Sequence, residues 1–138
     1  MIPKFRAWDK EEKVMIDWFW LSSEGKAYET PVTLYDTPHT EIERSDDLIL
    51  MQYTGLKDKN GVEIYEGDVV KRTYLFNRGY GETHTGEVVY DKEYARYVIS
   101  RPQKHIEPKT EDLRNTLSDR STYEIIGNIY ENRELLEV

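Results

Sequence analysis

Histidine side chains are the first candidates for metal binding or acid–base chemistry in this chain, because it contains no cysteine. The three histidines are His39, His84 and His105, and they lie far apart in the sequence. None of them forms the closely spaced helical pair that is typical of zinc enzymes. We therefore interpret them as structural or solvated side chains, and we predict neither a metal ion nor a cofactor.

Neighbouring carboxylates are the next candidates for chemistry. The pairs Asp46-Asp47 and Glu66 with Asp68 have the residue types of an acid–base couple. Such a couple works only when the surroundings separate the two pKa values, usually because one carboxyl group is partly buried. Nothing in the sequence around either pair demands burial, so we interpret both pairs as solvated polar surface.

The segment Asp58-Lys-Asn-Gly61 has the residue types that open a calcium-binding loop. The ligand series of such a loop is interrupted here, and the glutamate of its twelfth position is missing. Asn60-Gly61 is instead a strong signal for a hairpin turn, because both residues accept the positive φ that a tight turn requires. We predict a hairpin at this position.

No motif of an enzyme is visible in the sequence. It contains no Gly-x-Ser-x-Gly elbow, no phosphate-binding loop and no dinucleotide fingerprint, and its glycines are scattered at predicted turns. We expect a protein that is not an enzyme and has no evident small-molecule substrate.

A basic stretch with interleaved aromatic residues is the remaining candidate for a binding site. Small β-barrels bind single-stranded nucleic acid by stacking bases on aromatic rings while cations contact the phosphates. The residues predicted for such a site are Lys71, Arg72, Tyr74, Arg96, Tyr97 and Arg101. Strand alternation also places Arg72, Tyr74 and Phe76 on one face, so these rings fit a hydrophobic core equally well.

Short alternating segments between turns predict β-strands along most of the chain. Residues 4–8 and 15–20 form an opening hairpin, and residues 48–53 form a strand whose partner lies elsewhere in the sequence. Residues 22–47 are expected to be irregular. Further strands are predicted within 69–76, 85–90, 94–100 and 123–130, a polar connector between Pro102 and Pro108, one short helix over 110–117, and a terminal turn over 133–136 that Asn132 caps.

This spacing favours a small antiparallel barrel or a strongly bent sheet. A parallel sheet would need crossover helices, which the pattern does not supply. The predicted fold is mainly β with little helix.

The composition suits one soluble domain with a core of its own. The chain has 138 residues, a formal net charge of -8 and 11 tyrosines. Most of the excess acid lies in the first half, while residues 71–109 carry more basic than acidic side chains. No apolar stretch approaches the length of a membrane helix, and the N-terminus lacks the pattern of a secretory signal. We expect a cytoplasmic protein that does not interact with membranes.

Three blocks of the sequence resemble the YopX family of bacteriophage and prophage proteins. They are Lys4–Asp9, the central segment Met51–Gly61 with Glu63–Asp68, and Glu124–Asn132. The resemblance implies a protein encoded by a phage or prophage of a Gram-positive bacterium, in a family of uncharacterised function. It also implies an SH3-type barrel in the later part of the chain. A proline often follows the last block in this family, whereas Arg133 stands at this position.

These observations predict an N-terminal β segment over residues 1–60 and an SH3-like barrel over residues 61–138, with one compact unit as the alternative. The predicted role is that of a phage accessory protein that acts by binding in the cytoplasm of the bacterial host. Exposed sheet edges and the many aromatic residues favour contact with a protein partner or with a second copy of the chain. Single-stranded nucleic acid is the alternative partner.

Overall fold

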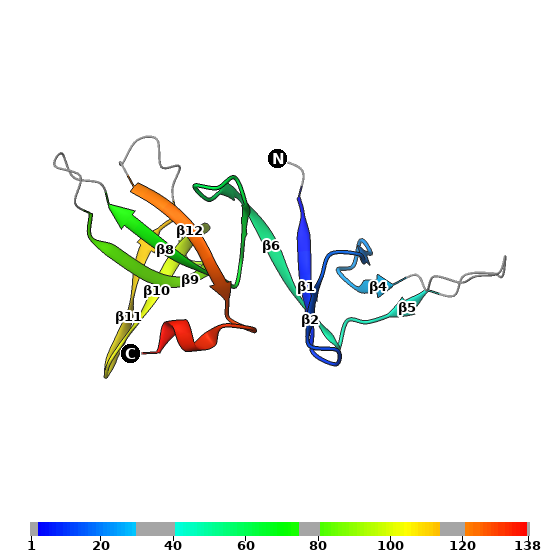
Figure 1. Cartoon of the computed structure of the whole chain (residues 1–138). Helices are drawn as coiled ribbons and strands as arrows, with labels where there is room; N and C mark the ends of the chain where they lie inside the picture. Colours follow the sequence, from blue (N-terminus) through cyan, green and yellow to red (C-terminus); the bar gives the residue numbers. More distant parts are fainter. Residues whose placement is uncertain (1–2, 30–40, 75–80, 114–120, 138) are drawn as a thin grey trace. The chain divides into compact units, whose positions relative to one another are not determined.

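The computed structural model describes residues 3–29, 41–74, 81–113 and 121–137, and it shows two compact units (Figure 1). The N-terminal unit contains residues 4–52, and the C-terminal unit contains residues 53–138 with the first three residues. The protein is mainly β, as predicted. Its elements are β1 (Phe5–Asp9), β2 (Val14–Ile16), β3 (Trp20–Leu21), β4 (Ala27–Glu29), β5 (Ile42–Glu43), β6 (Leu48–Lys57), β7 (Glu63–Tyr65), β8 (Asp68–Tyr74), β9 (Thr83–Asp91), β10 (Arg96–Gln103), β11 (Ile106–Asp112), β12 (Ser121–Asn128) and the short 3-10 helix η1 (Arg133–Leu136).

The N-terminal unit begins with the predicted hairpin, but its second strand ends at Ile16, and Trp20, which was predicted in that strand, belongs to β3. Strands β1 and β2 pair antiparallel, and β1 also pairs with the first half of β6, which is the distant partner that residues 48–53 require. Alternation along these strands directs their apolar side chains to one face. A small core results, formed by Ala7, Ile16, Ala27 and Leu48.

Three short strands in the order β3-β4-β5 form a second sheet of this unit. The segment 22–47 is therefore not irregular throughout, and the prediction was wrong for β4 and β5. These strands contain only three and two residues, which is too short for a periodic pattern to be seen in the sequence. Residues 30–40, including His39, lie outside the described residues.

Arg44 joins the two sheets of the N-terminal unit. Its guanidinium lies 2.9 Å from Asp9 on β1 and 2.8 Å from Glu29 on β4, and its Nε lies 3.4 Å from Asp47. Burial would raise the pKa of Asp9, but backbone hydrogen bonds from Glu12 and Glu11 and the contact with Arg44 together lower it. The buried carboxylate is thus held in its charged form.

The C-terminal unit contains a five-stranded antiparallel sheet in the order β11-β10-β9-β8-β12, and the second half of β6 pairs with β7. One face of the curved sheet carries the core, which is formed by the buried side chains of Ile64, Val70, Val88, Ile99, Leu113 and Tyr123. The curled sheet agrees with the predicted barrel, while the SH3-like topology stays a prediction. The two units divide between Gln52 and Tyr53, within β6 and upstream of the boundary predicted at residue 60, because the second half of β6 pairs with β7.

The predicted hairpin turn at Asn60-Gly61 is present, and Asp58 organises it. Asp58 Oδ1 accepts hydrogen bonds from the backbone N–H groups of Asn60 and Val62, each at 2.9 Å, and Gly61 adopts a φ of 81°. Asp58 Oδ2 accepts a third hydrogen bond from the N–H of Ile125 on β12. The side chain therefore fixes the turn and covers part of the outer edge of β12.

Two predictions for the region around residues 102–117 were wrong. Residues 106–112 form strand β11 instead of a connector followed by a helix, because β10 supplies a pairing partner for the backbone. Pro108 is accommodated because β11 is an edge strand, where a missing N–H is tolerated. Residues 114–117, the rest of the predicted helix, lie outside the described residues, as do Leu75 and Phe76 at the end of the predicted strand 69–76.

The interpretation of Asp68 as a solvated side chain was also wrong. Asp68 is 2% exposed, and its carboxylate accepts a hydrogen bond of 2.8 Å from the N–H of Tyr65 across the reversal at Gly67. A buried carboxylate with backbone donors stabilises a turn, so the role of Asp68 is structural.

Candidate functional site

A single carboxylate gathers the polar side chains on the inner face of the C-terminal sheet. Glu111 on β11 lies within hydrogen-bond distance of side chains from three other strands, and its own side chain is 10% exposed. Its neighbours are Tyr74 Oη at 2.8 Å, His84 Nδ1 at 2.8 Å, Arg101 Nη2 at 3.1 Å and Arg72 Nη1 at 3.4 Å. We call these five residues the Glu111 cluster.

Strand alternation explains why these side chains meet. Arg72 and Tyr74 follow the core residue Val70 on the same face of β8, and Arg101 follows the core residue Ile99 on β10. His84 on β9 is the cross-strand partner of Arg72. The inner face of the sheet is therefore apolar around Val70 and Ile99. Two residues further along the same strands, it carries the polar side chains of the Glu111 cluster.

The charges within the cluster compensate one another. Burial would raise the pKa of Glu111, but the hydrogen bonds from Tyr74 and His84 and the charge of Arg101 together lower it. Burial and the hydrogen bond to Glu111 raise the pKa of Tyr74 to about 12. The phenol therefore stays protonated and donates a hydrogen bond to the carboxylate. Arg72 also lies over the rings of Tyr74 and Tyr123, at 4.3 Å and 5.3 Å from their centroids. The arrangement is a buried ion network with its donors directed inward.

Residues 102–110, which we call the arm, form the hairpin that continues β10 and β11 beyond the cluster. Every residue of the arm is exposed, and Ile106 has 68% of its surface accessible. The two-residue turn Lys104-His105 closes the hairpin, with His105 at a φ of 65°. Figure 1 shows the two strands running together past the rest of the sheet. Arg101 and Glu111 of the cluster form the root of the arm.

The structure places the six residues of the predicted nucleic-acid site in four environments. Arg72, Tyr74 and Arg101 meet in the Glu111 cluster. Arg96 is ion-paired with Asp112 at 2.6 Å and with Asp91 at 3.7 Å. Tyr97 packs against the core, and Lys71 is exposed on the opposite face, where it is the cross-strand partner of Glu124. The six side chains therefore do not form one continuous face.

Sequence reasoning missed Glu111 and His84 as members of the cluster. Glu111 belongs to the segment for which a helix was predicted, so its orientation could not be inferred. Alternation along β9 could have indicated His84, because it places His84 on the same face as the core residue Val88. The register with β8 then brings His84 beside Arg72. His105 lies in the exposed turn of the arm, which agrees with a solvated histidine.

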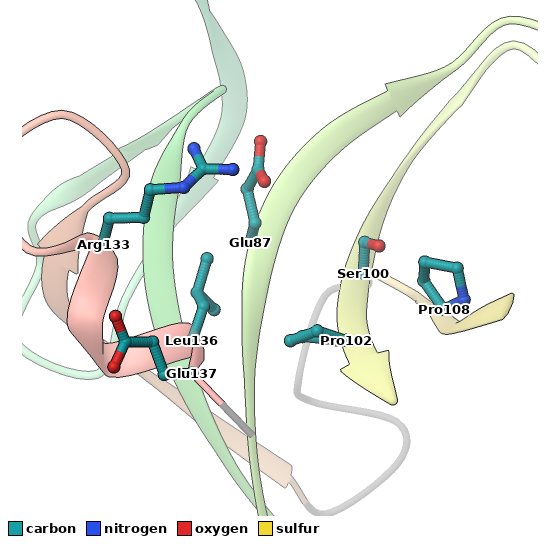
Figure 2. A pocket seen from close by; sticks show the side chains of 7 residues that line it. All are labelled: Glu87, Ser100, Pro102, Pro108, Arg133, Leu136 and Glu137. Atoms are coloured by element: carbon teal, nitrogen blue, oxygen red, sulfur yellow. The ribbon is translucent and has the colours of Figure 1, made fainter. Parts of the chain in front are cut away.

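A shallow pocket of about 280 Å³ lies on the outer face of the same sheet, between the strands and η1 (Figure 2). Its lining residues are Glu87, Ser100, Pro102, Pro108, Arg133, Leu136 and Glu137. Glu87 and Ser100 are cross-strand partners on β9 and β10. Burial raises the pKa of the Glu87 carboxyl group, and the charge of Arg133 offsets only part of this effect. We call this feature the Glu87 pocket.

Within the residues that the structure describes, no group of three or more His, Asp or Glu side chains is arranged to hold a metal ion. No helix in this part of the chain is long and apolar enough to cross a membrane.

The fold and these sites define a small β-rich protein in which a curled sheet carries an exposed arm. A family model described as "YopX protein" matches residues 4–137, so the chain belongs to the YopX family. A search of curated proteins finds no match.

Two solved structures share this architecture. Protein EF1440 from Enterococcus faecalis has 28% sequence identity and a TM-score of 0.57, with 99% of each chain covered. Protein yopX from Bacillus subtilis has 23% identity and a TM-score of 0.61, with 96% of this chain and 97% of that chain covered. The likeness therefore extends over nearly the whole length of the protein.

Proposed function

We propose that this protein acts by binding and not by catalysis, and that it assembles with a second copy of itself through the arm. The observation that carries the proposal is the exposure of the arm, in which Ile106 lies 68% exposed beside the turn at Lys104-His105. An apolar side chain at the end of a projecting hairpin favours association, because covering its surface releases water.

Charge supports a second copy as the partner. The arm carries Lys104 and Lys109 against one acid, Glu107, whereas the whole chain has a net charge of -8. A basic arm on an acidic protein finds a complementary surface on another molecule of the same kind. Exposed aromatic residues of the N-terminal unit add an apolar contact for Ile106: Trp18 is 62% exposed, and Trp20 stacks on Tyr28 with ring centroids 4.5 Å apart.

The Glu111 cluster supports the same role from within the sheet. Arg101 and Glu111 connect the root of the arm to β8 and β9 through Arg72, Tyr74 and His84. A root fixed in this way reduces the entropy that the arm would lose on binding. The basic and aromatic side chains here thus support a contact surface and are not themselves that surface.

Binding of single-stranded nucleic acid is the weaker alternative. Phosphate contacts require cations that are free to exchange their counterions. Arg72 and Arg101 are paired with Glu111, and Arg96 is paired with Asp112. The arrangement therefore favours a protein partner.

The cellular setting is part of the proposal. The family resemblance suggests an accessory protein of a phage or prophage, acting in the cytoplasm of its bacterial host. Two similar solved proteins come from the bacteria Enterococcus faecalis and Bacillus subtilis, which supports a bacterial setting.

Molar mass measured against concentration tests the proposed assembly. We expect the mass to rise above that of one 16.4 kDa chain as the concentration increases. Ile106→Ser should weaken the association about tenfold, because burying an isoleucine contributes roughly 1.5–3 kcal/mol. Val62→Ser is the matched control, since Val62 is 52% exposed in the turn between β6 and β7, outside the arm. A mass of one chain at every concentration, or equal effects of the two substitutions, would contradict the proposal. Salt-dependent binding to an oligo-dT strand by the wild type would favour the alternative.

A further inference from the structure

The Glu87 pocket contains a carboxyl group that lacks a fixed partner within the described part of the chain. Glu87 lies on β9. Its side chain is on the outer face of the sheet, while that of the next residue, Val88, points into the core on the inner face. Among the described residues, no hydrogen bond or ion pair holds its carboxyl group, and its pKa is raised because burial outweighs the attraction of Arg133. A half-buried carboxyl group of this kind, facing a pocket, is typical of a binding site.

The walls of the pocket are apolar on two sides. Pro102 and Pro108 come from the two strands at the base of the arm, and Leu136 comes from η1 (Figure 2). Proline rings and a leucine side chain suit the methylene groups of an extended aliphatic chain. Ser100 adds a hydroxyl group beside Glu87.

The charges of the lining residues favour a cation. Glu87 and Glu137 are acidic and Arg133 is basic, so the acidic side chains are in excess. Figure 2 shows the Arg133 guanidinium on the same side of the pocket as the Glu87 carboxyl group. Arg133 is itself exposed, which leaves it free to move away from Glu87.

We propose that the Glu87 pocket binds the side chain of a lysine or arginine that a peptide segment of a partner protein presents. The methylene stem lies against Pro102, Pro108 and Leu136, and the cationic group forms an ion pair with Glu87. Arg133 occupies part of this position in the free protein and is displaced on binding. A peptide segment can reach the pocket because Pro102, Pro108 and Glu137 at its rim are exposed. This inference goes beyond the proposed function. Pro102 and Pro108 belong to the arm, but Ile106, whose replacement tests self-assembly, does not line the pocket, so the two proposals are tested separately.

Amide chemical shifts in a nuclear magnetic resonance titration test the proposal with short peptides. The probe is acetyl-Gly-Lys-Gly-amide, and the matched neutral probe replaces lysine with norleucine, which keeps the aliphatic stem without the charge. We expect the lysine peptide to shift the amides of Glu87, Ser100 and Leu136, and the norleucine peptide to bind at least several-fold more weakly. A glutamate peptide should leave these amides unchanged.

Variants of the pocket sharpen the test. Glu87→Gln should weaken binding of the lysine peptide about fivefold, as expected for the loss of one partly exposed ion pair. Arg133→Gln should tighten binding, because it removes the competing cation. Glu93→Gln is the control, since Glu93 is an exposed acid outside the pocket.

Four results would overturn the inference. They are an absence of shifts at the pocket, equal binding of the norleucine peptide, binding of the glutamate peptide that Arg133→Gln abolishes, and tighter binding of free n-butylamine than of the lysine peptide. The third result would define an anion site on Arg133, and the fourth would assign the pocket to a free amine. Glu87→Gln is expected to fold, because it removes a carboxyl group whose pKa burial has raised.

Discussion

Arg101 and Glu111 form a diagonal ion pair across the root of the arm, with Arg101 Nη2 at 3.1 Å from Glu111 Oε1. In the register of β10 and β11, Glu111 is paired with Ile99 and Arg101 is paired with Lys109. The pair therefore lies at the border between the core, to which Ile99 belongs, and the exposed hairpin. Glu111 also contacts β8 and β9, so one side chain connects the arm to three strands of the sheet.

Glu111→Gln should destabilise the C-terminal unit by about 3 kcal/mol, because breaking a buried ion pair leaves uncompensated charge. Arg72, whose side chain is 7% exposed, would lose the carboxylate of Glu111. Urea unfolding followed by circular dichroism measures the change. Glu107→Gln on the same strand is the control, since Glu107 is exposed and its replacement should change the free energy of unfolding by less than about 0.5 kcal/mol. Equal stability of the two variants would show that the Glu111 cluster contributes little.

Arg44→Met should destabilise the N-terminal unit by about 3 kcal/mol, because Asp9 and Glu29 would keep their charges without the guanidinium of Arg44. Tryptophan fluorescence reports this unit alone, since Trp8, Trp18 and Trp20 are the three tryptophans of the chain. Lys26→Met serves for comparison, because Lys26 is exposed. An unfolding midpoint that Arg44→Met leaves in place would refute the role given to Arg44.

Acid should destabilise both units. The pKa values of Asp9 and Glu111 are lowered from 3.8 and 4.5 in the folded protein, so each carboxylate stabilises the fold above its unfolded pKa. This stability is lost as the pH falls from about 4.5 through the folded pKa values. The free energy of unfolding, measured between pH 7 and pH 2, should decrease over this window. The decrease should be smaller in Asp9→Asn and Glu111→Gln, and a decrease of the same size in these variants would contradict the assignment.

Glu87→Gln should have the opposite dependence on pH. The pKa of Glu87 is raised from 4.5, so the folded protein binds this proton more tightly than the unfolded chain does. Stability from this group is greatest at low pH and is lost as the pH rises from about 4.5 through the folded pKa. The variant should therefore be more stable than the wild type at pH 7 and lose this advantage near pH 4. A thermal unfolding series at both pH values, with Glu93→Gln alongside, measures the difference.

Asp58→Ala should cost about 2–4 kcal/mol, because the N–H groups of Asn60, Val62 and Ile125 would lose their acceptor. Asp58→Asn should have an intermediate effect, since an amide keeps one acceptor oxygen. Chemical unfolding compares these variants with Asn60→Ala, which changes an exposed side chain of the same turn. A neutral effect of Asp58→Ala would show that water replaces the carboxylate.

Local signals in the sequence were sufficient for most of the longer strands, the opening hairpin and the turn at Asn60-Gly61. These features depend on alternation and on turn residues, which act over a few positions. The same reasoning failed for β11, because Pro108 and the polar residues around it resemble a connector unless the pairing with β10 is known. It also failed for β4 and β5, which are too short for a pattern.

The sequence by itself determined a mainly β protein of the YopX family in which Arg72, Tyr74 and Arg101 are placed on strands with defined faces. Only the tertiary structure decided what these side chains contact. A carboxylate from β11 enters the same face and pairs with the cations, so residues with the chemistry of a nucleic-acid site become the anchor of an arm. The physical reason is that alternation specifies the face of a side chain, whereas its partner depends on the order and register of strands that are distant in the sequence.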